Sequence, residues 1–349
     1  MNSHPARRAP LATVPAAVVA VALLVAGLVG GCGPSSGPGG ATATLTPLKV
    51  GLGYIPSVQF AHFYLAQQAG YYREAGLDIT FENKIDPDLV VLVGQGAIDA
   101  GLADGTSVIP AVSRGISIRY LATIYAQFPN VVFAKTDSGI SSAADLKGKR
   151  VGTPGRYGSN WIQLQALLAS AGLTPDDVKV VTFDNFGQAT GLARGAIDAA
   201  TGYINNDPIQ LSEQGIPVTV VTGEGVTSLT GPGIIASTAT IASKPEALRA
   251  FIAATLRAMQ EIIVDPQKGL DATIRQVPEL GSDREGQLAI LEATIKIWQS
   301  PYTDEHGLGA IDPQAWSDSI AFMSTLPEGY VKDPVTVDQL IDPSLLPAK

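Results

Sequence analysis

The stretch KVGLGYIPSVQFAHFYLAQQAGYYREAGLDIT, residues 49–80, predicts a strand, a loop, a helix, a turn and a second strand. Apolar residues alternate with small or charged residues over 48–52, which is the period of a strand. Over 58–68 the apolar residues return at helical spacing, and Gly70 follows as a stop signal. Residues 77–81 then begin the second strand.

The same arrangement recurs further along the chain. Residues 150–152 (RVG) repeat residues 49–51 (KVG) at an offset of 101, and the pentapeptide GAIDA occurs at 96–100 and 195–199, an offset of 99. We therefore expect two similar α/β units, with a strand over 97–102 and another at the second GAIDA copy. Open α/β sheets bind ligands at the carboxyl ends of their strands, so two opposed units would form a binding cleft.

The first 31 residues are interpreted as a bacterial lipoprotein signal peptide. Arg7 and Arg8 precede an uncharged apolar run over 11–29, and small residues lead to Cys32. An uncleaved transmembrane helix is the alternative, because about 20 apolar residues can span a bilayer. The signal peptide predicts lipidation of Cys32, a flexible tether over 32–47, and a protein of the cell envelope, lipid-anchored to the outer face of the cytoplasmic membrane.

Composition limits the partners. Cys32 is the only cysteine in the sequence, so neither an intramolecular disulfide nor a cysteine metal cluster is expected. Removal of the leader leaves 318 residues and changes the formal net charge from −9 to about −11. This acidity argues against nucleic acid and against an anionic membrane surface as a partner. We expect no metal and no cofactor, and the length permits one large or two ordinary domains.

Catalytic motifs are not visible in the sequence. The mature chain has only His62 and His306, and it contains neither a Gly-x-Ser-x-Gly nor a His-Glu-x-x-His motif. His62 falls inside the first predicted helix, where a packed histidine is the simpler interpretation. We therefore expect a binding protein with no catalytic residue, and an exported hydrolase is the alternative.

Polar and aromatic residues gather in the loops that we expect to face the cleft. Thr106 or Ser107 can cap a helix and present free backbone N–H groups to the cleft, or can serve the cap alone. The loop over 152–160 is rich in Gly and Pro, which lets a ligand approach the backbone. Residues 203–207 follow the second GAIDA strand. A turn explains the Asn and Asp at 206–207 well, but it explains Tyr203 and Asn205 less well. The candidate ligand-binding residues are Tyr54, Gln59, Thr106, Ser107, Gln127, Phe128, Gly155, Arg156, Tyr157, Asn160, Trp161, Asn185, Tyr203, Asn205, Asn206 and Asp207.

These side chains indicate the chemistry of the ligand. Asn and Gln amides both donate and accept hydrogen bonds, which matches the edge of a neutral heterocycle, and aromatic faces can stack on its ring. Phe60 and Phe186 are further rings of these loops, and we interpret them as core residues. Arg156 is the one cation of the set, so an anionic group such as a phosphate or sulfonate stays open.

Several motifs together resemble a known family. They are GYIP at 53–56, GYY at 70–72 followed by GLD at 76–78, DLKGK at 145–149 followed by VG at 151–152, and GRYG at 155–158. They are similar to motifs of the solute-binding proteins for thiamine pyrimidine precursors. Those proteins share ancestry with yeast thiamine-pyrimidine synthase and are related to the alkanesulfonate, taurine and nitrate binders. The resemblance covers residues 48–300.

The resemblance implies an α/β fold of the bilobed periplasmic-binding-protein class (type II-like), with two α/β lobes joined by two crossing strands. We place lobe 1 at 48–130 plus 236–326, lobe 2 at 131–235 and a C-terminal tail at 327–349. It also implies the solute-binding lipoprotein of an ABC transporter, a monomer whose partners are a small-molecule ligand and the ABC permease and ATPase subunits. The ligand would bind between the lobes and draw them together.

Two departures from the family bear on the ligand. The synthase branch carries a cysteine-rich motif that this chain lacks, and pyrimidine binders usually have Trp where this chain has Tyr54. Residues 53–61 and 205–210 look closer to a branch proposed to carry riboflavin. The resemblance thus implies a small aromatic heterocycle, either a thiamine pyrimidine precursor or riboflavin. An alkanesulfonate, taurine or nitrate is the alternative.

Overall fold

The two strands predicted near residues 49 and 150 are both present, and each belongs to its own mixed sheet. The structure is a computed structural model that describes residues 44–84, 88–223 and 229–347. The predicted leader, Cys32 and most of the predicted tether lie outside these ranges.

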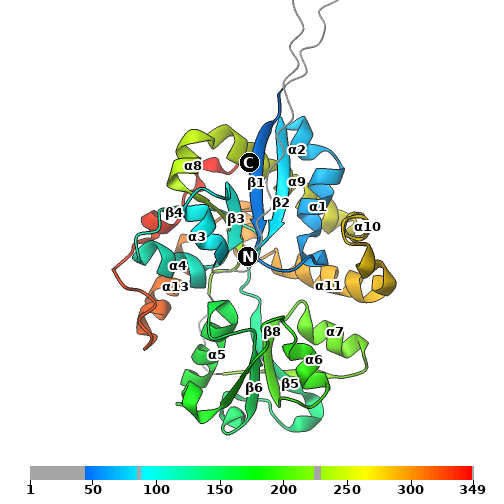
Figure 1. The fold of residues 1–349 in the computed structure, drawn as a ribbon, viewed down its shortest axis with the longest axis vertical. Helices are drawn as coiled ribbons and strands as arrows, with labels where there is room; N and C mark the ends of the chain where they lie inside the picture. Colours follow the sequence, from blue (N-terminus) through cyan, green and yellow to red (C-terminus); the bar gives the residue numbers. More distant parts are fainter. Residues whose placement is uncertain (1–43, 85–87, 224–228, 348–349) are drawn as a thin grey trace, which may run out of the picture. The chain divides into compact units, whose positions relative to one another are not determined.

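The first sheet has the strand order β2-β1-β3-β10-β4. The strands are β1 (Thr46–Leu52), β2 (Leu77–Asn83), β3 (Ala100–Ala103), β4 (Ile118–Thr123) and β10 (Gly233–Ser237). The first three are parallel, and β10 is antiparallel to both of its neighbours. The sheet carries the helices η1 (Val58–Phe60), α1 (Ala61–Gln68), α2 (Tyr71–Glu74), α3 (Asp88–Gly94) and α4 (Gly105–Ser113), of which α1 to α4 are labelled in Figure 1.

The second sheet repeats this plan in the order β7-β6-β8-β5-β9. Its strands are β5 (Asn130–Lys135), β6 (Arg150–Thr153), β7 (Lys179–Thr182), β8 (Ala199–Tyr203) and β9 (Val218–Val221). Here β6, β7 and β8 are parallel and β5 is antiparallel to β8. Its α-helices are α5 (Gly158–Ser170), α6 (Gln188–Ala193) and α7 (Asp207–Glu213).

The chain passes between the sheets twice, from β4 to β5 and from β9 to β10. We call the first sheet with its helices lobe 1 and the second sheet with its helices lobe 2. All of β10 pairs with lobe 1, so the expected lobe boundary between residues 235 and 236 falls inside a lobe 1 strand and is wrong. Asn130, expected as the last residue of lobe 1, is the first residue of β5 in lobe 2. The expected strand over 97–102 begins only at Ala100, because the preceding residues form a turn.

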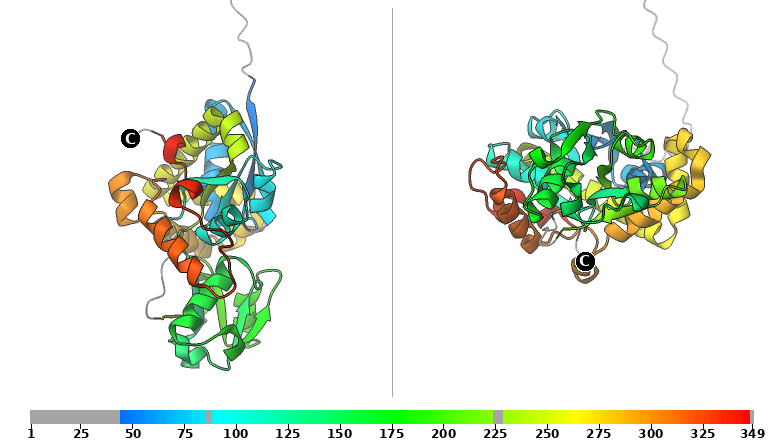
Figure 2. Two further views of the ribbon diagram at one scale, coloured as in Figure 1. Left: turned by 90° about the vertical axis from the view of Figure 1, so that its left-hand side faces the viewer. Right: turned by 90° about the horizontal axis from the view of Figure 1, so that it is seen from below.

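Helices after β10 complete lobe 1, and Figure 2 lets the reader follow them from yellow to red. They are α8 (Thr238–Ser243), α9 (Pro245–Val264), α10 (Pro266–Gln276), α11 (Arg284–Ile297), α12 (Pro301–His306), α13 (Pro313–Thr325) and α14 (Val337–Leu340). The segment expected as a surface tail after residue 326 is anchored to lobe 1. Ile341 forms a β-bridge with Tyr120 of β4, and Leu340 and Leu345 are buried.

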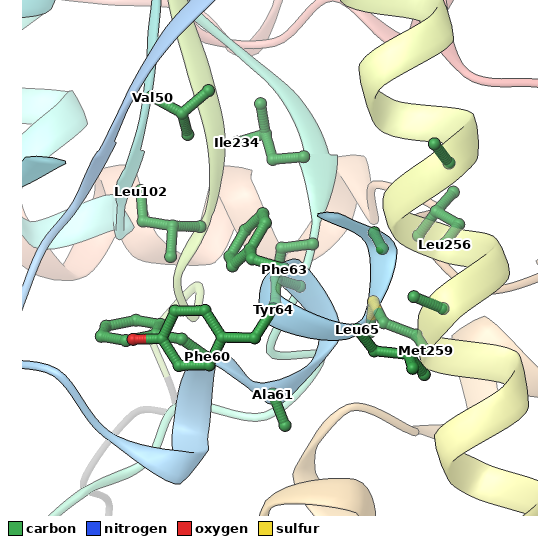
Figure 3. Packing of buried hydrophobic residues seen from close by; sticks show 14 of the residues in the cluster. Val50, Phe60, Ala61, Phe63, Tyr64, Leu65, Leu102, Ile234, Leu256 and Met259 are labelled. Carbon is green, nitrogen blue, oxygen red and sulfur yellow. The ribbon is translucent and has the colours of Figure 1, made fainter. Parts of the chain in front are cut away.

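The main core of lobe 1 lies where α1 meets the sheet and α9. Figure 3 shows Phe63 among Leu102 and Ile234 of the sheet and Met259 of α9. The Phe63 ring stacks on the Phe251 ring at 6.0 Å between centroids, and burial of such a side chain contributes about 2 kcal/mol. This packing fixes α1, and α1 in turn positions the loop before it. Within the described ranges, no helix is both long and apolar enough to span a membrane.

Candidate functional site

A cleft lies at the carboxyl ends of the parallel strands, and both lobes contribute to its walls. It holds about 1030 Å³ of open space, part of which is continuous with solvent. The lining residues are Gly53, Tyr54, Gln59, Phe60, His62, Leu102, Ala103, Asp104, Ile124, Tyr125, Pro154, Tyr157, Gly158, Ser159, Asn160, Phe186, Gln188, Gly202, Tyr203, Asn206, Asp207 and Pro232. Ligand pockets of open α/β folds occupy this position.

The loop after β1 forms one wall. The strand ends at Leu52, and the Ser57 side chain caps η1 by accepting a hydrogen bond from the Gln59 backbone N–H. The Gln59 Nε2 atom donates to the same Ser57 oxygen at 3.2 Å, which holds the amide in place. Phe60 belongs to the lobe 1 core, as expected, and it also lines the cleft.

His62 forms part of the floor in lobe 1. Its side chain is fully buried, and neither ring nitrogen has a hydrogen-bond partner. The ring packs against Phe63 at 4.1 Å and edge-on against Trp298 at 5.0 Å between centroids. Burial lowers the pKa of His62 to about 3, so the imidazole is neutral near pH 7.

Asp104 stands at the end of β3 and caps α4. Its Oδ1 atom accepts from the Thr106 backbone N–H at 2.9 Å and from the Thr106 hydroxyl at 2.6 Å. Burial raises the pKa of Asp104, and hydrogen bonds from Thr106 and from Ser159 of lobe 2 oppose that rise. The residue that caps α4 is therefore Asp104. Thr106 and Ser107 were expected at the cleft, but neither is among its lining residues. Asp104 was as strong a capping candidate in the sequence as Ser107, since Asn, Asp and Ser rank together as capping residues.

The loop between β6 and α5 forms the facing wall in lobe 2. Tyr157 precedes the first residue of α5 and is 44% exposed, so its ring is available to a ligand. The Asn130 Nδ2 atom donates to Ser159 Oγ at 3.1 Å and to Asn160 Oδ1 at 3.0 Å, which fixes the first turn of α5. Asn130 thus supports the wall from β5.

Arg156, from the same loop, is not among the lining residues. Its guanidinium carbon lies 5.2 Å from the centre of the Trp161 ring, and Trp161 is buried in a hydrophobic cluster of lobe 2. Gly155, between Arg156 and the cleft-lining Pro154, is likewise absent from the lining set. Within the described part of the chain, the cleft therefore has no lysine or arginine in its walls.

The end of β8 supplies a second buried carboxylate. Asp207 Oδ2 accepts from the Tyr203 backbone N–H at 2.9 Å, and burial raises the pKa of Asp207 to about 6. Glycine at residue 202 lets the carboxylate approach the strand, since a Cβ there would lie 2.5 Å from Asp207 Oδ2 and one of the two would have to shift. Burial raises the pKa of Tyr54, and the nearby Asp207 raises it further, while a hydrogen bond with Asn206 opposes the rise. Tyr54 of lobe 1 therefore meets the polar end of β8 in lobe 2.

Phe186 completes the aromatic lining. Its backbone is left-handed with φ of 58°, and its ring lies edge-on to Tyr54 with centroids 4.8 Å apart. Phe186 was expected in the core, and the cleft position corrects that expectation. Asn185 instead forms a turn, because its Oδ1 atom accepts from the Gly187 N–H at 3.2 Å. The next residue, Gln188, is buried, lines the cleft, and has no hydrogen-bond partner for Oε1.

Asn205 connects the lobes behind the cleft wall. Its Nδ2 atom donates to Gln59 Oε1 at 3.2 Å and to Thr294 Oγ1 at 2.8 Å, both in lobe 1. Gln127 Nε2 donates to the carbonyl oxygens of Lys296 and Gln299, and Phe128 packs against a lobe 1 core. Gln127 and Phe128 lie in the first crossing segment, and none of these three residues lines the cleft.

The structure thus divides the candidate residues into two groups. Those that line the cleft are Tyr54, Gln59, Tyr157, Asn160, Tyr203, Asn206 and Asp207. Those that do not are Thr106, Ser107, Gln127, Phe128, Gly155, Arg156, Trp161, Asn185 and Asn205. The polar residues that sequence reasoning missed are His62, Asp104, Tyr125, Ser159 and Gln188. No group of three or more His, Cys, Asp or Glu side chains in the described residues could hold a metal ion.

Comparison with known proteins gives consistent results along the chain. A family model described as NMT1/THI5 like matches residues 57–269. The riboflavin-binding protein RibY of Chloroflexus aurantiacus is 32% identical over 320 residues, which cover 90% of this chain and 90% of that protein. A 4-amino-5-hydroxymethyl-2-methylpyrimidine phosphate synthase of Aspergillus parasiticus is 29% identical over 237 residues, covering 64% of this chain and 68% of that protein.

A solved structure shares the fold. The alkanesulfonate-binding protein SsuA from Xanthomonas axonopodis pv. citri, bound to MOPS, superimposes with a TM-score of 0.64 over 87% of this chain and 99% of that one. The two sequences are 20% identical, so this likeness concerns the fold alone. The bilobed periplasmic-binding-protein fold expected from the sequence is confirmed.

Proposed function

The chain belongs to the NMT1/THI5-like family, as the sequence motifs indicated, and on that premise we propose that it is the solute-binding protein of an ABC importer. Its ligand is a neutral aromatic heterocycle held between the lobes, with riboflavin as the first candidate. ABC permease and ATPase subunits are the partners in this proposal, and the protein itself performs no reaction.

The charge of the cleft is the main observation in favour of a neutral ligand. Asp104 of lobe 1 and Asp207 of lobe 2 are both buried in its walls, and no lysine or arginine of the described residues lines it. A sulfonate, nitrate or phosphate bound there would face carboxylates without a compensating cation, which is costly in a buried site. Carboxylates instead accept hydrogen bonds from N–H and O–H groups. The alternative of a small anion as ligand is therefore disfavoured.

The aromatic residues suit a flat ring system. Among the described residues, the Tyr and Phe side chains that line the cleft are Tyr54, Phe60, Tyr125, Tyr157, Phe186 and Tyr203. Stacked or edge-on contacts with such rings are favourable beyond the area they bury. An isoalloxazine ring uses more of this surface than a single pyrimidine, and ribityl hydroxyls can donate to the carboxylates. The name of the relative from Chloroflexus aurantiacus supports the same choice.

A thiamine pyrimidine precursor is the second candidate. The name of the Aspergillus parasiticus relative favours it, since that protein is named for synthesis of an aminopyrimidine phosphate. The cleft would bind the pyrimidine only without its phosphate, because a phosphate would face the buried carboxylates of Asp104 and Asp207 without a compensating cation. The absence of any cysteine besides Cys32 argues against synthase chemistry of the cysteine-rich type, so binding without turnover is proposed.

Export and anchoring are part of the proposal. The apolar leader and Cys32 support a lipoprotein tethered to the outer face of the cytoplasmic membrane. We expect Cys32→Ser to release the protein from the membrane fraction. Retention of that variant in the membrane would favour an uncleaved helix.

A ligand panel tests the proposed function. Purified mature protein is titrated with riboflavin, formylaminopyrimidine, thiamine, taurine and nitrate, and the melting temperature is recorded with each. A ligand that binds only the native state raises the melting temperature by mass action. The proposal predicts stabilisation by riboflavin or a pyrimidine without turnover. Stabilisation by taurine or nitrate alone, or formation of a product, would contradict it.

A further inference from the structure

Two buried polar side chains of the cleft have atoms without hydrogen-bond partners. His62 is fully buried, and both its ring nitrogens are unpaired. Gln188 is 2% exposed, and its Oε1 atom is unpaired. Buried polar groups are normally paired, so unpaired ones at a cleft wall are candidates for a partner that arrives from outside.

The two residues belong to opposite lobes and are held firmly. His62 is on α1 of lobe 1 and contacts the rings of Phe63 and Trp298. Gln188 is the first residue of α6 in lobe 2, and its Cβ would lie 3.2 Å from a Cβ added at Gly152 of β6. Close packing on both sides limits how far either side chain can move to find a partner within the protein.

Other polar groups of the cleft already have partners inside the protein. Gln59 is bonded to Ser57 and accepts from Asn205, and the carboxylates of Asp104 and Asp207 accept from backbone N–H groups. A ligand gains most from groups that are unpaired in its absence, because the cost of their burial is recovered on binding. His62 and Gln188 meet this condition.

We propose that His62 and Gln188 read the hydrogen-bonding groups of the ligand, one from each lobe. The ligand presents an N–H or O–H donor to Gln188 Oε1 and a carbonyl or ring-nitrogen acceptor to the imidazole N–H. The second imidazole nitrogen accepts from a further donor. This inference rests on the proposed function, and it adds that the ligand must carry both donors and acceptors.

The state of His62 supports these roles. Its burial lowers the pKa to about 3, so it is neutral near pH 7 and offers one donor and one acceptor. Because His62 lies in lobe 1 and Gln188 in lobe 2, a ligand that contacts a single lobe leaves the side chain of the other lobe unpaired. Full pairing is reached only when both lobes engage the same ligand, which couples specificity to closure.

Gln188→Met and His62→Leu test the inference, with Thr201→Val as the matched control. Thr201 on β8 is also fully buried with an unpaired hydroxyl, but it does not line the cleft. Each substitution removes an unpaired buried polar group, so each should raise the melting temperature without ligand by roughly 1–3 °C. Riboflavin affinity should fall by at least about tenfold in the two cleft variants and stay within about twofold of wild type in the control.

His62→Gln serves as a second variant, since it keeps a donor and an acceptor near the same place. It should bind riboflavin more tightly than His62→Leu. Riboflavin binding equal to wild type in Gln188→Met and His62→Leu would overturn the inference and leave the proposed function intact. A lower melting temperature with unchanged affinity would overturn it as well, since that result marks a purely structural role. A wild-type protein that binds no member of the ligand panel would instead contradict the proposed function.

Discussion

Each lobe has an equivalent aspartate, Asp99 or Asp198, that accepts a hydrogen bond from the backbone of a strand. The two aspartates differ in their charged partners. In lobe 1 the Asp99 carboxylate accepts from the Lys49 backbone N–H at 2.9 Å, and in lobe 2 the Asp198 carboxylate accepts from the Arg150 N–H at 2.8 Å. The charged partner of Asp99 is Lys244 from the segment after α8, whereas Asp198 pairs with the side chain of Arg150 itself. The GAIDA repeat therefore encodes a clamp that ties β1 to β3 in lobe 1 and β6 to β8 in lobe 2.

The difference between the lobes lies in the loops beyond these strands. After β1 the loop presents Tyr54 and Gln59, and after β6 it presents Pro154 and Tyr157, with no sequence shared between them. Residues that recur in both halves build the scaffold, and residues that differ face the cleft. The comparison predicts that changes to the repeat alter stability, while changes to the loops alter binding.

The largest expected contrast between the lobes is in their response to acid. Burial lowers the pKa of His62 to about 3 in the folded state, so the unfolded state binds the proton more tightly below pH 6.5. His62 should therefore cost about 3 kcal/mol of stability between pH 7 and pH 4. His62→Leu should show a smaller acid loss than wild type in melts across this range. Parallel pH profiles for the two proteins would contradict the assignment.

The effect of Asp207 in lobe 2 on stability should depend on pH in the opposite sense to that of His62. Burial raises its pKa to about 6, so the folded state binds the proton more tightly than the unfolded state, and stability is lost as the pH rises through 6. Asp207→Asn should increase the free energy of unfolding relative to wild type by about 1.4 kcal/mol more at pH 8 than at pH 5, and the melting temperature should follow. A gain that does not change with pH would show that Asp207 does not titrate in this range.

Breaking the clamps should give a smaller change, and one that differs between the lobes. Asp198 accepts from the backbone N–H and from two side-chain nitrogens of Arg150, whereas Asp99 accepts from Lys49 N–H and Lys244 Nζ. Asp198→Ala should lower the melting temperature by roughly 3–6 °C, and Asp99→Ala by somewhat less. Riboflavin affinity measured in the folded range should change by less than about twofold. A large loss of affinity with intact stability would contradict the division between scaffold and site.

The smallest predicted effect concerns one loop residue. Tyr157 is 44% exposed and lines the cleft, so Tyr157→Ala should weaken riboflavin binding by about tenfold with little change in melting temperature. Ile55→Ala is the control in lobe 1, because Ile55 is 47% exposed and lies outside the lining set. Isothermal titration of the two variants checks this pair. Equal affinities would place the ligand away from the loop before α5.

The repeat made the fold predictable, because each half carries its strand and turn signals within a short segment. The lobe boundary was harder, since Gly233 to Ile235 continue a strand of lobe 1 whose partners, β3 and β4, precede it by more than a hundred residues. Only long-range pairing assigns that strand, and no local pattern reports it.

The cleft was predictable only in part. Tyr54, Tyr157 and Asp207 follow strands directly, and position alone identifies them. His62 and Gln188 lie inside helices, where burial next to a cleft cannot be separated from burial in a core by periodicity. The position of Arg156 outside the lining residues was not predictable for a related reason, since its contact with Trp161 depends on side-chain direction.

The central claim is that the cleft takes a neutral heterocycle because it pairs two buried carboxylates with no cation. Its most direct test compares riboflavin with riboflavin 5′-phosphate in a flavin fluorescence titration of the purified mature protein at pH 7.5. We predict one site for riboflavin and an affinity for the phosphate ester at least about tenfold lower. Equal or tighter binding of the phosphate ester would contradict the claim.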